Sequence, residues 1–185
     1  MAMADSLIPG KLRGKILLAD PSLRGSIFQR SVVLIHDHDR SGAIGLILNQ
    51  PTGKNVGDFL KSAEFENLQS VPVYVGGPVE GNQLSFCSLW WTPKQGLRWA
   101  VRISPDQASE LARKPGRMIR AFIGYSGWGE GQLENELERD CWLTIAPESS
   151  LLDISHDSAL WKRLMGEISP HHQLMALAPE NFYLN

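Results

Sequence analysis

The glycine-rich segment at residues 124–132, which reads GYSGWGEGQ, combines flexible backbone with aromatic, hydroxyl and amide side chains. Glycines permit unusual backbone angles, and a helix that begins after them would offer free amide donors to a phosphate or carboxylate. The alternative, which we favour, is a turn that lets a strand enter a helix while Tyr125 and Trp128 pack. Gly124 and Ser126 fit the start of the nucleophile-elbow pattern G-x-S-x-G, but Trp128 occupies its last glycine, so we expect no serine nucleophile.

Polar residues from distant parts of the chain could join this segment in a small pocket for an anion. Arg24, Arg30 and Asn49 lie beside predicted apolar strands, where their donors could converge with Tyr125 and Gln132. Each of them also fits a salt bridge or a strand cap, which is the more common use of such residues. We assign no catalytic residue, and the candidate ligand-binding residues are Arg24, Asn49, Tyr125, Ser126, Gly127 and Gln132.

Two histidines raise the question of a metal ion. His36 and His38 stand at positions i and i+2 at the end of a predicted strand, so their side chains would point the same way. A metal site needs further ligands, and the other histidines, at positions 156, 171 and 172, lie far along the chain. The segment 76–81 lacks the lysine or serine that would follow the glycines of a P-loop. We therefore expect no metal and no cofactor.

The charge pattern does not indicate a nucleic-acid partner. A basic cluster of Arg113, Lys114, Arg117 and Arg120 stands at the end of a predicted helix and in the next strand, where we expect it to offset the helix dipole on a solvated surface. The formal net charge of the chain is −2, so no global field attracts nucleic acid or an anionic membrane. No arginine-rich recognition helix follows a short turn, and we expect no direct nucleic-acid binding.

Length and composition are typical of one globular domain in a reducing compartment. The chain has 185 residues, 43% of them hydrophobic, and we expect a single domain over residues 1–185. Cys87 and Cys141 form no CxxC pair, so we expect two buried thiols rather than a disulfide. No apolar run approaches the ~20 residues of a membrane span, and the first residues lack the pattern of a signal peptide. We predict a cytoplasmic protein with no membrane association.

Short strands interrupted by single helices dominate the predicted elements. Ser104 caps the clearest helix, because Pro105 follows it and Gln107 completes a capping box. Other helices are expected at 55–60, after residue 132 and from residue 157. Strands are predicted at 14–21, 31–36, 43–49, 71–75, 84–90, 98–103, 117–123, 141–145 and 151–154. This order favours an α+β fold with a mixed, mainly antiparallel sheet.

Several segments, taken together, resemble the YqgE/AlgH family of bacterial proteins, which lacks an assigned biochemical activity. They are GKILLADPS at 14–22, FQRSV at 28–32, GAIGLILNQP at 42–51, YVGGPV at 74–79 and GYSGWGEGQL at 124–133. The resemblance implies a compact α+β domain whose bent sheet curls toward a pseudo-barrel with helices packed outside. The chain departs from the family at residues 175–181, where MALAPEN replaces a Gly-His-Ala ending. Some members carry the label of a transcriptional regulator, which the sequence does not support as direct DNA reading.

Three functions remain open at this point. The leading hypothesis is a non-enzymatic or regulatory binding protein for an unknown ligand, either a small molecule or a protein, because turns and core anchors account for most special residues. One alternative is an enzyme that acts on a small anionic metabolite at the predicted 124–132 turn. Another is a protein interaction module, which would require an exposed apolar patch of several hundred Å². The sequence indicates no oligomeric state.

Overall fold

The computed structural model describes residues 11–23, 25–153 and 157–177, so the candidate Arg24 lies outside the described residues. Within these ranges nine strands join in one sheet. Their bounds are β1 Ile16–Ala19, β2 Val32–Asp39, β3 Gly42–Ile47, β4 Pro51–Asn55, β5 Pro72–Val75, β6 Val79–Thr92, β7 Gly96–Ile103, β8 Arg117–Gly129 and β9 Trp142–Ile145. The predicted strands over residues 14–145 are thus present, with β4 added directly after the hairpin of β2 and β3.

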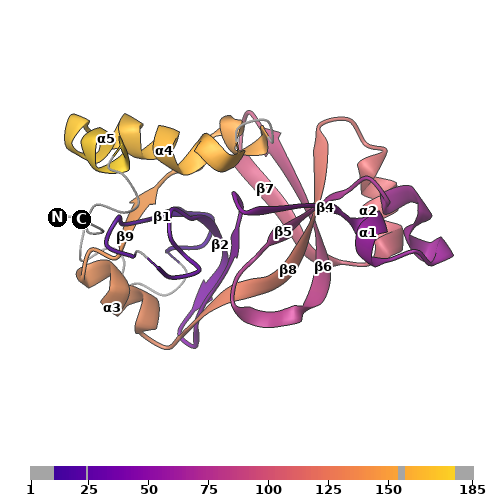
Figure 1. Ribbon diagram of the computed structural model, residues 1–185, viewed down its shortest axis with the longest axis horizontal. Coiled ribbons are helices and arrows are strands. Elements are labelled where there is room, and N and C mark those ends of the chain that lie inside the picture. Colours follow the sequence, from indigo (N-terminus) through magenta and orange to yellow (C-terminus); the bar gives the residue numbers. More distant parts are fainter. Residues whose placement is uncertain (1–10, 24, 154–156, 178–185) are drawn as a thin grey trace, which may run out of the picture.

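The sheet is mixed and mainly antiparallel, as predicted. The strand order is β4-β5-β8-β3-β2-β1-β9, and β6 and β7 branch from β8. The pair of β5 with β8 is parallel. The sheet curls into a half-barrel with the helices outside (Figure 1). Arg13, in the segment before β1, lies with its guanidinium 6.0 Å from the ring centroid of Trp99 in β7, so this segment spans from β2 toward β7.

Helices cover the two ends of the sheet (Figure 1). Their bounds are α1 Val56–Phe59, α2 Pro105–Ala112, α3 Gln132–Glu138, α4 Asp157–Ile168 and α5 Pro170–Leu177, with 3-10 helices η2 Ala63–Leu68 and η3 Ser149–Leu152. The capping box predicted for α2 is confirmed, since the Ser104 hydroxyl accepts from the Gln107 amide and the Gln107 side chain accepts from the Ser104 amide. None of the described helices is long and apolar enough to span a membrane.

Residues 124–129 continue strand β8, so the turn predicted there is wrong. Their backbone pairs with β3, with Gly129 opposite Gly42 and Ser126 opposite Gly45. This pairing comes from residues about 80 positions earlier in the chain, so no local signal announces it. Gly124 has a φ of +68°, and a Cβ at this position would lie 2.5 Å from the carbonyl oxygen of Gly77. That glycine therefore allows two backbones to pass closely.

Two smaller predictions are also corrected. Residues 149–152 form the 3-10 helix η3, not the strand predicted at 151–154, and Ile154 lies outside the described residues. Cys87 is buried as predicted, but Cys141 is only half-buried, because it stands at the edge of the fold before β9. Both cysteines are free thiols.

Arg120 is fully buried, which corrects its assignment to a solvated basic surface. Its guanidinium donates to the carbonyl oxygen of Leu48 at 2.8 Å and pairs with Asp157 at 3.3 Å. The hydroxyl of Tyr74 donates to the other oxygen of Asp157 at 2.5 Å, and the guanidinium lies 4.6 Å from the Tyr74 ring centroid. This network joins β8, the end of β3, β5 and the start of α4. A buried charge with these partners is costly to leave unpaired.

The Asp157→Ala variant should therefore lose about 3–5 kcal/mol in the free energy of unfolding, because it leaves the Arg120 charge buried without its carboxylate. The exposed pair of Lys114 and Glu110 supplies a matched control, and Glu110→Ala should cost under about 0.5 kcal/mol. Urea denaturation of the full chain measures both values. Similar losses for the two variants would contradict the role given to the buried pair.

Candidate functional site

A cavity of about 450 Å³ lies beside β8, lined on one side by β2 and β3 and on the other by β6 and β7. Its wall is formed by residues of β2, β3, β6, β7 and β8, together with Leu60 after α1, Phe65 of η2 and Pro105 of α2. We call it the β2–β7 cavity, after the strands that contribute His36 and Arg102. Its volume is in the range of small-molecule sites.

His36 lines this cavity because β2 is interrupted at this residue. Ile35 pairs with Gly45 and Asp37 with Ile44, so His36 is the extra residue of a β-bulge. A bulge re-aims its extra side chain relative to the regular alternation of the strand. The buried imidazole of His36 thus faces the cavity.

Arg102 reaches the same cavity through a second bulge. Phe86 pairs with Ile103 and Cys87 with Val101, which leaves Arg102 as the extra residue of β7. Its φ is +53°, a left-handed conformation that costs an L-residue about 1–2 kcal/mol. Strained backbone that persists in a fold is a pointer to function. An arginine is held here although a glycine would fit the backbone better.

A third interruption, between β6 and β8, completes the rim. Val79 pairs with Tyr125 and Leu84 with Ile123, so residues 80–83 bulge out opposite Gly124. Within this bulge Glu80 also has a positive φ, of +53°. Glu80 and Gln83 line the cavity, and both are exposed. The cavity is therefore surrounded by three breaks in the sheet ladders.

Arg102 and Tyr125 form the polar centre of the wall. The guanidinium carbon of Arg102 lies 5.3 Å from the centroid of the Tyr125 ring, a cation–π arrangement. Within the described part of the chain the guanidinium forms no ion pair, so its planar fork of donors remains available to a carboxylate or phosphate.

Burial lowers the pKa of His36 below its ordinary value. The nearby positive charges of Arg102 and Arg13 lower this pKa further, while the carboxylate of Asp37 raises it. The imidazole is therefore neutral near pH 7 and offers one hydrogen-bond donor and one acceptor. Arg13 also donates from its Nε to the carbonyl oxygen of His36 at 3.1 Å, which steadies the bulge.

Cys87 lines the cavity as a protonated thiol. Burial raises the pKa of the thiol to about 12, although the Arg120 charge opposes this shift. A thiol attacks as its thiolate, so Cys87 is a poor nucleophile near neutral pH. Its contribution to the wall is that of a small apolar group.

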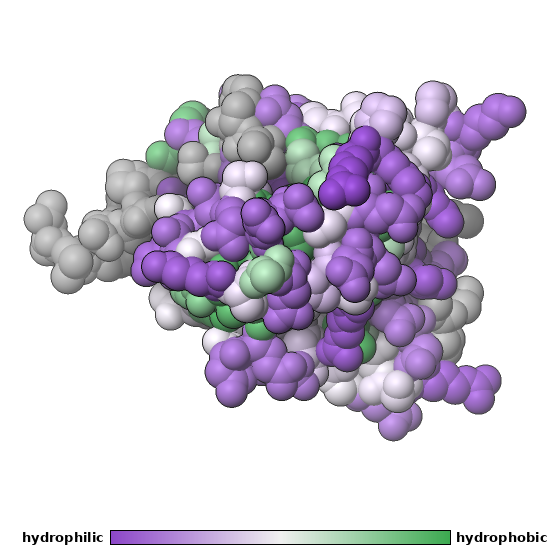
Figure 2. Space-filling model, turned by 90° about the vertical axis from the view of Figure 1, so that its right-hand side faces the viewer, coloured by the Kyte–Doolittle hydropathy of each residue, from purple (hydrophilic) through white to green (hydrophobic). Residues whose placement is uncertain are grey.

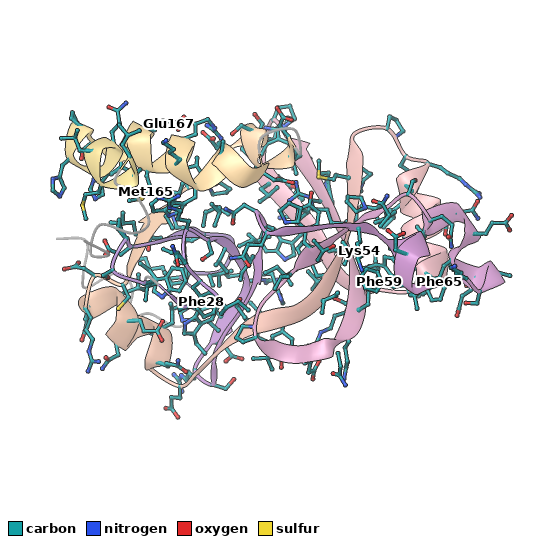
Figure 3. All side chains as sticks on the ribbon, viewed as in Figure 1. Phe28, Lys54, Phe59, Phe65, Met165 and Glu167 are labelled. Atoms are coloured by element: carbon teal, nitrogen blue, oxygen red, sulfur yellow. The ribbon has the colours of Figure 1, made fainter. Side chains whose placement is uncertain are left out.

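One end of the cavity is apolar. Leu60, Phe65, Leu84, Phe86 and Ile103 all pack in the same hydrophobic cluster and also line the cavity. The rings of Phe65 and Phe86 are stacked, with their centroids 6.1 Å apart. Figure 3 shows Phe65 beside Phe59 at the end of the molecule that carries α1 and α2, well away from Phe28. The cavity therefore has a polar side near β2 and an apolar side near η2.

The structure distributes the predicted ligand-binding residues over different surroundings. The Asn49 side chain accepts from the Val32 amide at 2.8 Å and donates to the Arg30 carbonyl at 2.9 Å. Ser126 is buried and donates to the Gly76 carbonyl at 3.0 Å. Gln132 accepts from the Gly129 amide and donates to Glu136. These three side chains already serve the fold, and their ligand-binding role stays a prediction.

A second hollow, of about 350 Å³, lies beside the β2–β3 turn and is lined by Gly127 and by Tyr125. Its charged residues are Asp37 and Asp39, and the pKa of Asp39 is lowered by hydrogen bonds from Ser41. Two carboxylates oppose the anionic ligand predicted for this region. Tyr125 belongs to both spaces, and the cavity with Arg102 suits an anion better.

His36 and His38 do not share a site, although their spacing predicts side chains that point the same way. The bulge at His36 turns it to the cavity, whereas the buried His38 contacts Glu134 with its Nε2 at 2.8 Å and accepts from the Leu12 amide with its Nδ1. Among the described residues, no group of three or more His, Cys, Asp or Glu side chains is placed to hold a metal ion.

A family profile described as AlgH-like matches residues 16–173. The chain belongs to the AlgH-like family. A UPF0301 protein of Bacteroides thetaiotaomicron is 32% identical, covering 96% of this chain and 92% of its own, and one of Streptomyces avermitilis is 31% identical over 94% and 95%. The solution structure of AlgH from Pseudomonas aeruginosa has a TM-score of 0.62 at 27% identity and covers 91% of this chain and 95% of its own. A crystal structure from Corynebacterium diphtheriae shares the fold, with a TM-score of 0.69 at 22% identity over 90% and 92%.

Arg102 is the residue of this site that the sequence did not single out. It stands in an alternating strand pattern, RWAVRI at 98–103, which predicts a regular outward side chain. The bulge at Arg102 arises from the pairing of β7 with β6, which the sequence does not show. The positive φ of this arginine has no local sequence signal either. The sequence raised His36 as a possible metal ligand. In the structure it lines the same cavity as Arg102.

Replacing Arg102 tests whether its backbone is strained. Arg102→Gly should be more stable than Arg102→Ala by about 1 kcal/mol, because only glycine adopts a positive φ without steric cost. At Arg98, an exposed residue of the same strand without a positive φ, alanine should be the more stable of the two substitutions. Urea denaturation measures all four variants. The same rank order at both positions would contradict the strain.

The lowered pKa of His36 predicts a dependence of stability on pH. The unfolded imidazole binds a proton more readily than the folded one. The contribution of His36 to stability is therefore present above about pH 6.5 and is lost as the pH falls below that value through the lower pKa of the folded state. The difference in melting temperature between wild type and His36→Gln should therefore be less favourable to wild type at pH 5.5 than at pH 8. A difference that stays constant or grows on acidification would contradict this.

Proposed function

We propose that the chain is a non-enzymatic or regulatory binding protein, and that a small molecule binds in the β2–β7 cavity. One observation carries the proposal: the extra residues of two separate β-bulges, His36 and Arg102, meet at the same cavity. Bulges are frequent beside functional sites because they re-aim side chains. A partly apolar cavity with a few convergent polar groups is the usual form of a ligand site. Tyr125, a candidate from the sequence, also lines this cavity.

The chemistry of the wall supports binding rather than catalysis. The Cys87 thiol of the wall is protonated near neutral pH. Ser126, the serine of the glycine-rich segment, is not part of the wall and donates its hydroxyl to a backbone carbonyl. His36 is neutral and can act as a hydrogen-bond partner to a ligand. The groups that face the cavity thus suit recognition better than covalent chemistry. An enzyme acting on an anionic metabolite is the alternative that turnover would reveal.

The interaction-module hypothesis gains less support from the surface. The end of the molecule that carries α1 and α2 is covered mostly by hydrophilic side chains, with hydrophobic residues only between them (Figure 2). Among the described residues, the large exposed hydrophobic side chains are Ile27, Phe59, Ile168, Leu174 and Leu177, of which the last three lie on the neighbouring helices α4 and α5. The single domain over residues 1–185 and the cytoplasmic location stay predictions.

A thermal-shift screen with a cavity-blocking variant tests the proposal. The full chain is screened against a library of metabolites, and compounds that raise the melting temperature are repeated with Gln83→Trp, which places an indole at the cavity wall. Gln95→Trp, in the exposed turn between β6 and β7, is the matched control. Compounds that bind the cavity should lose their shift with Gln83→Trp and keep it with Gln95→Trp.

Mass spectrometry of the same mixtures separates binding from turnover. The proposal expects each stabilising compound to be recovered unchanged after incubation. A shift that survives in Gln83→Trp would place the site elsewhere, and conversion of a bound compound would establish the enzyme alternative.

A further inference from the structure

We infer that the ligand of the β2–β7 cavity is a monocarboxylate with an apolar body, whose carboxylate meets Arg102 and whose body lies against the side of the cavity near η2. This inference rests on the proposed function and names the chemical class that the cavity selects. It follows from three properties of the wall: the kind of cation, the number of charges and the position of the apolar side chains.

The cation of the wall is the guanidinium of Arg102, an exposed residue that lies against the Tyr125 ring. The bulge and the positive φ of Arg102 fix where its side chain leaves β7, and the Tyr125 ring lies 5.3 Å from the guanidinium carbon. A planar guanidinium binds a carboxylate through two parallel hydrogen bonds. The neutral imidazole of His36, on the same wall, can donate one more hydrogen bond to an anion.

The count of charges favours a single negative charge on the ligand. Arg102 is the cation of the cavity wall, and Glu80 on the rim is an anion. Near His36, the carboxylate of Asp37 and the guanidinium of Arg13 carry opposite charges and offset each other. A phosphate dianion would therefore be compensated only in part and would face the carboxylate of Glu80, whereas one carboxylate is matched by the one guanidinium.

The apolar side of the cavity determines which kind of body the ligand has. Leu60, Phe65, Phe86 and Ile103 expose part of their surface to the cavity while they pack in one hydrophobic cluster. Ile103 directly follows Arg102 in β7, so the two kinds of wall adjoin each other. A molecule with its charge at one end and a hydrocarbon body at the other would satisfy both.

Isothermal titration calorimetry with three matched probes tests the inference. Octanoate, 1-octanol and octyl phosphate share one hydrocarbon body and differ in the head group. Wild type should bind octanoate at least about tenfold more tightly than 1-octanol, because a charge-assisted pair adds to the same apolar burial. It should also bind octanoate more tightly than octyl phosphate. Arg102→Gln, which keeps a polar side chain without the charge, should erase the preference for octanoate and leave 1-octanol binding unchanged.

The outcomes distinguish the inference from the proposed function. If 1-octanol binds as tightly as octanoate, or octyl phosphate binds more tightly, and Gln83→Trp abolishes that binding, the cavity is a ligand site but the carboxylate assignment is wrong. A preference for octanoate that persists in Arg102→Gln overturns the role of Arg102. Binding that Gln83→Trp leaves intact overturns both. If no probe binds, the inference is overturned, and the metabolite screen decides the proposed function on its own.

Discussion

The fold depends on strand β8, because its residues pair with β3, β5 and β6 and so hold both halves of the sheet. A strand with so many neighbours is buried along most of its length, and at Arg120 it carries a charge into the interior. The carboxylate of Asp157 and the carbonyl of Leu48 compensate that charge, which fixes the start of α4 against the sheet. Hydrophobic clusters then fill both faces of this frame.

The same frame creates the site. A sheet that curls around β8 cannot keep regular ladders everywhere, and three of its interruptions fall at His36, at Arg102 and opposite Gly124. Each of these three turns a side chain or a backbone bend toward one cavity, so the polar wall is a consequence of how the sheet bends. The apolar wall comes from η2 and the adjoining ends of β6 and β7, which close the opposite side.

Features set by neighbours in the sequence were predictable, and features set by distant pairing were not. Ser104, Pro105 and Gln107 define the start of α2 within four residues, and the structure confirms it. The segment after Gly124 looks like a turn because its strand partner, β3, lies about 80 residues earlier. Arg120 looks like surface for the same reason, since Asp157 and Leu48 lie 37 and 72 residues away. The family and the α+β fold were predictable from motifs, whereas the cavity required the register of the strands.

Ligand binding between β2 and β7 can be followed through the amide chemical shifts of the isotopically labelled full chain during a titration with octanoate. The largest changes should fall on His36, Cys87, Arg102 and Tyr125, which come from four different strands and all line this cavity. Largest changes confined to residues 127–132, or to α4 and α5, would contradict it.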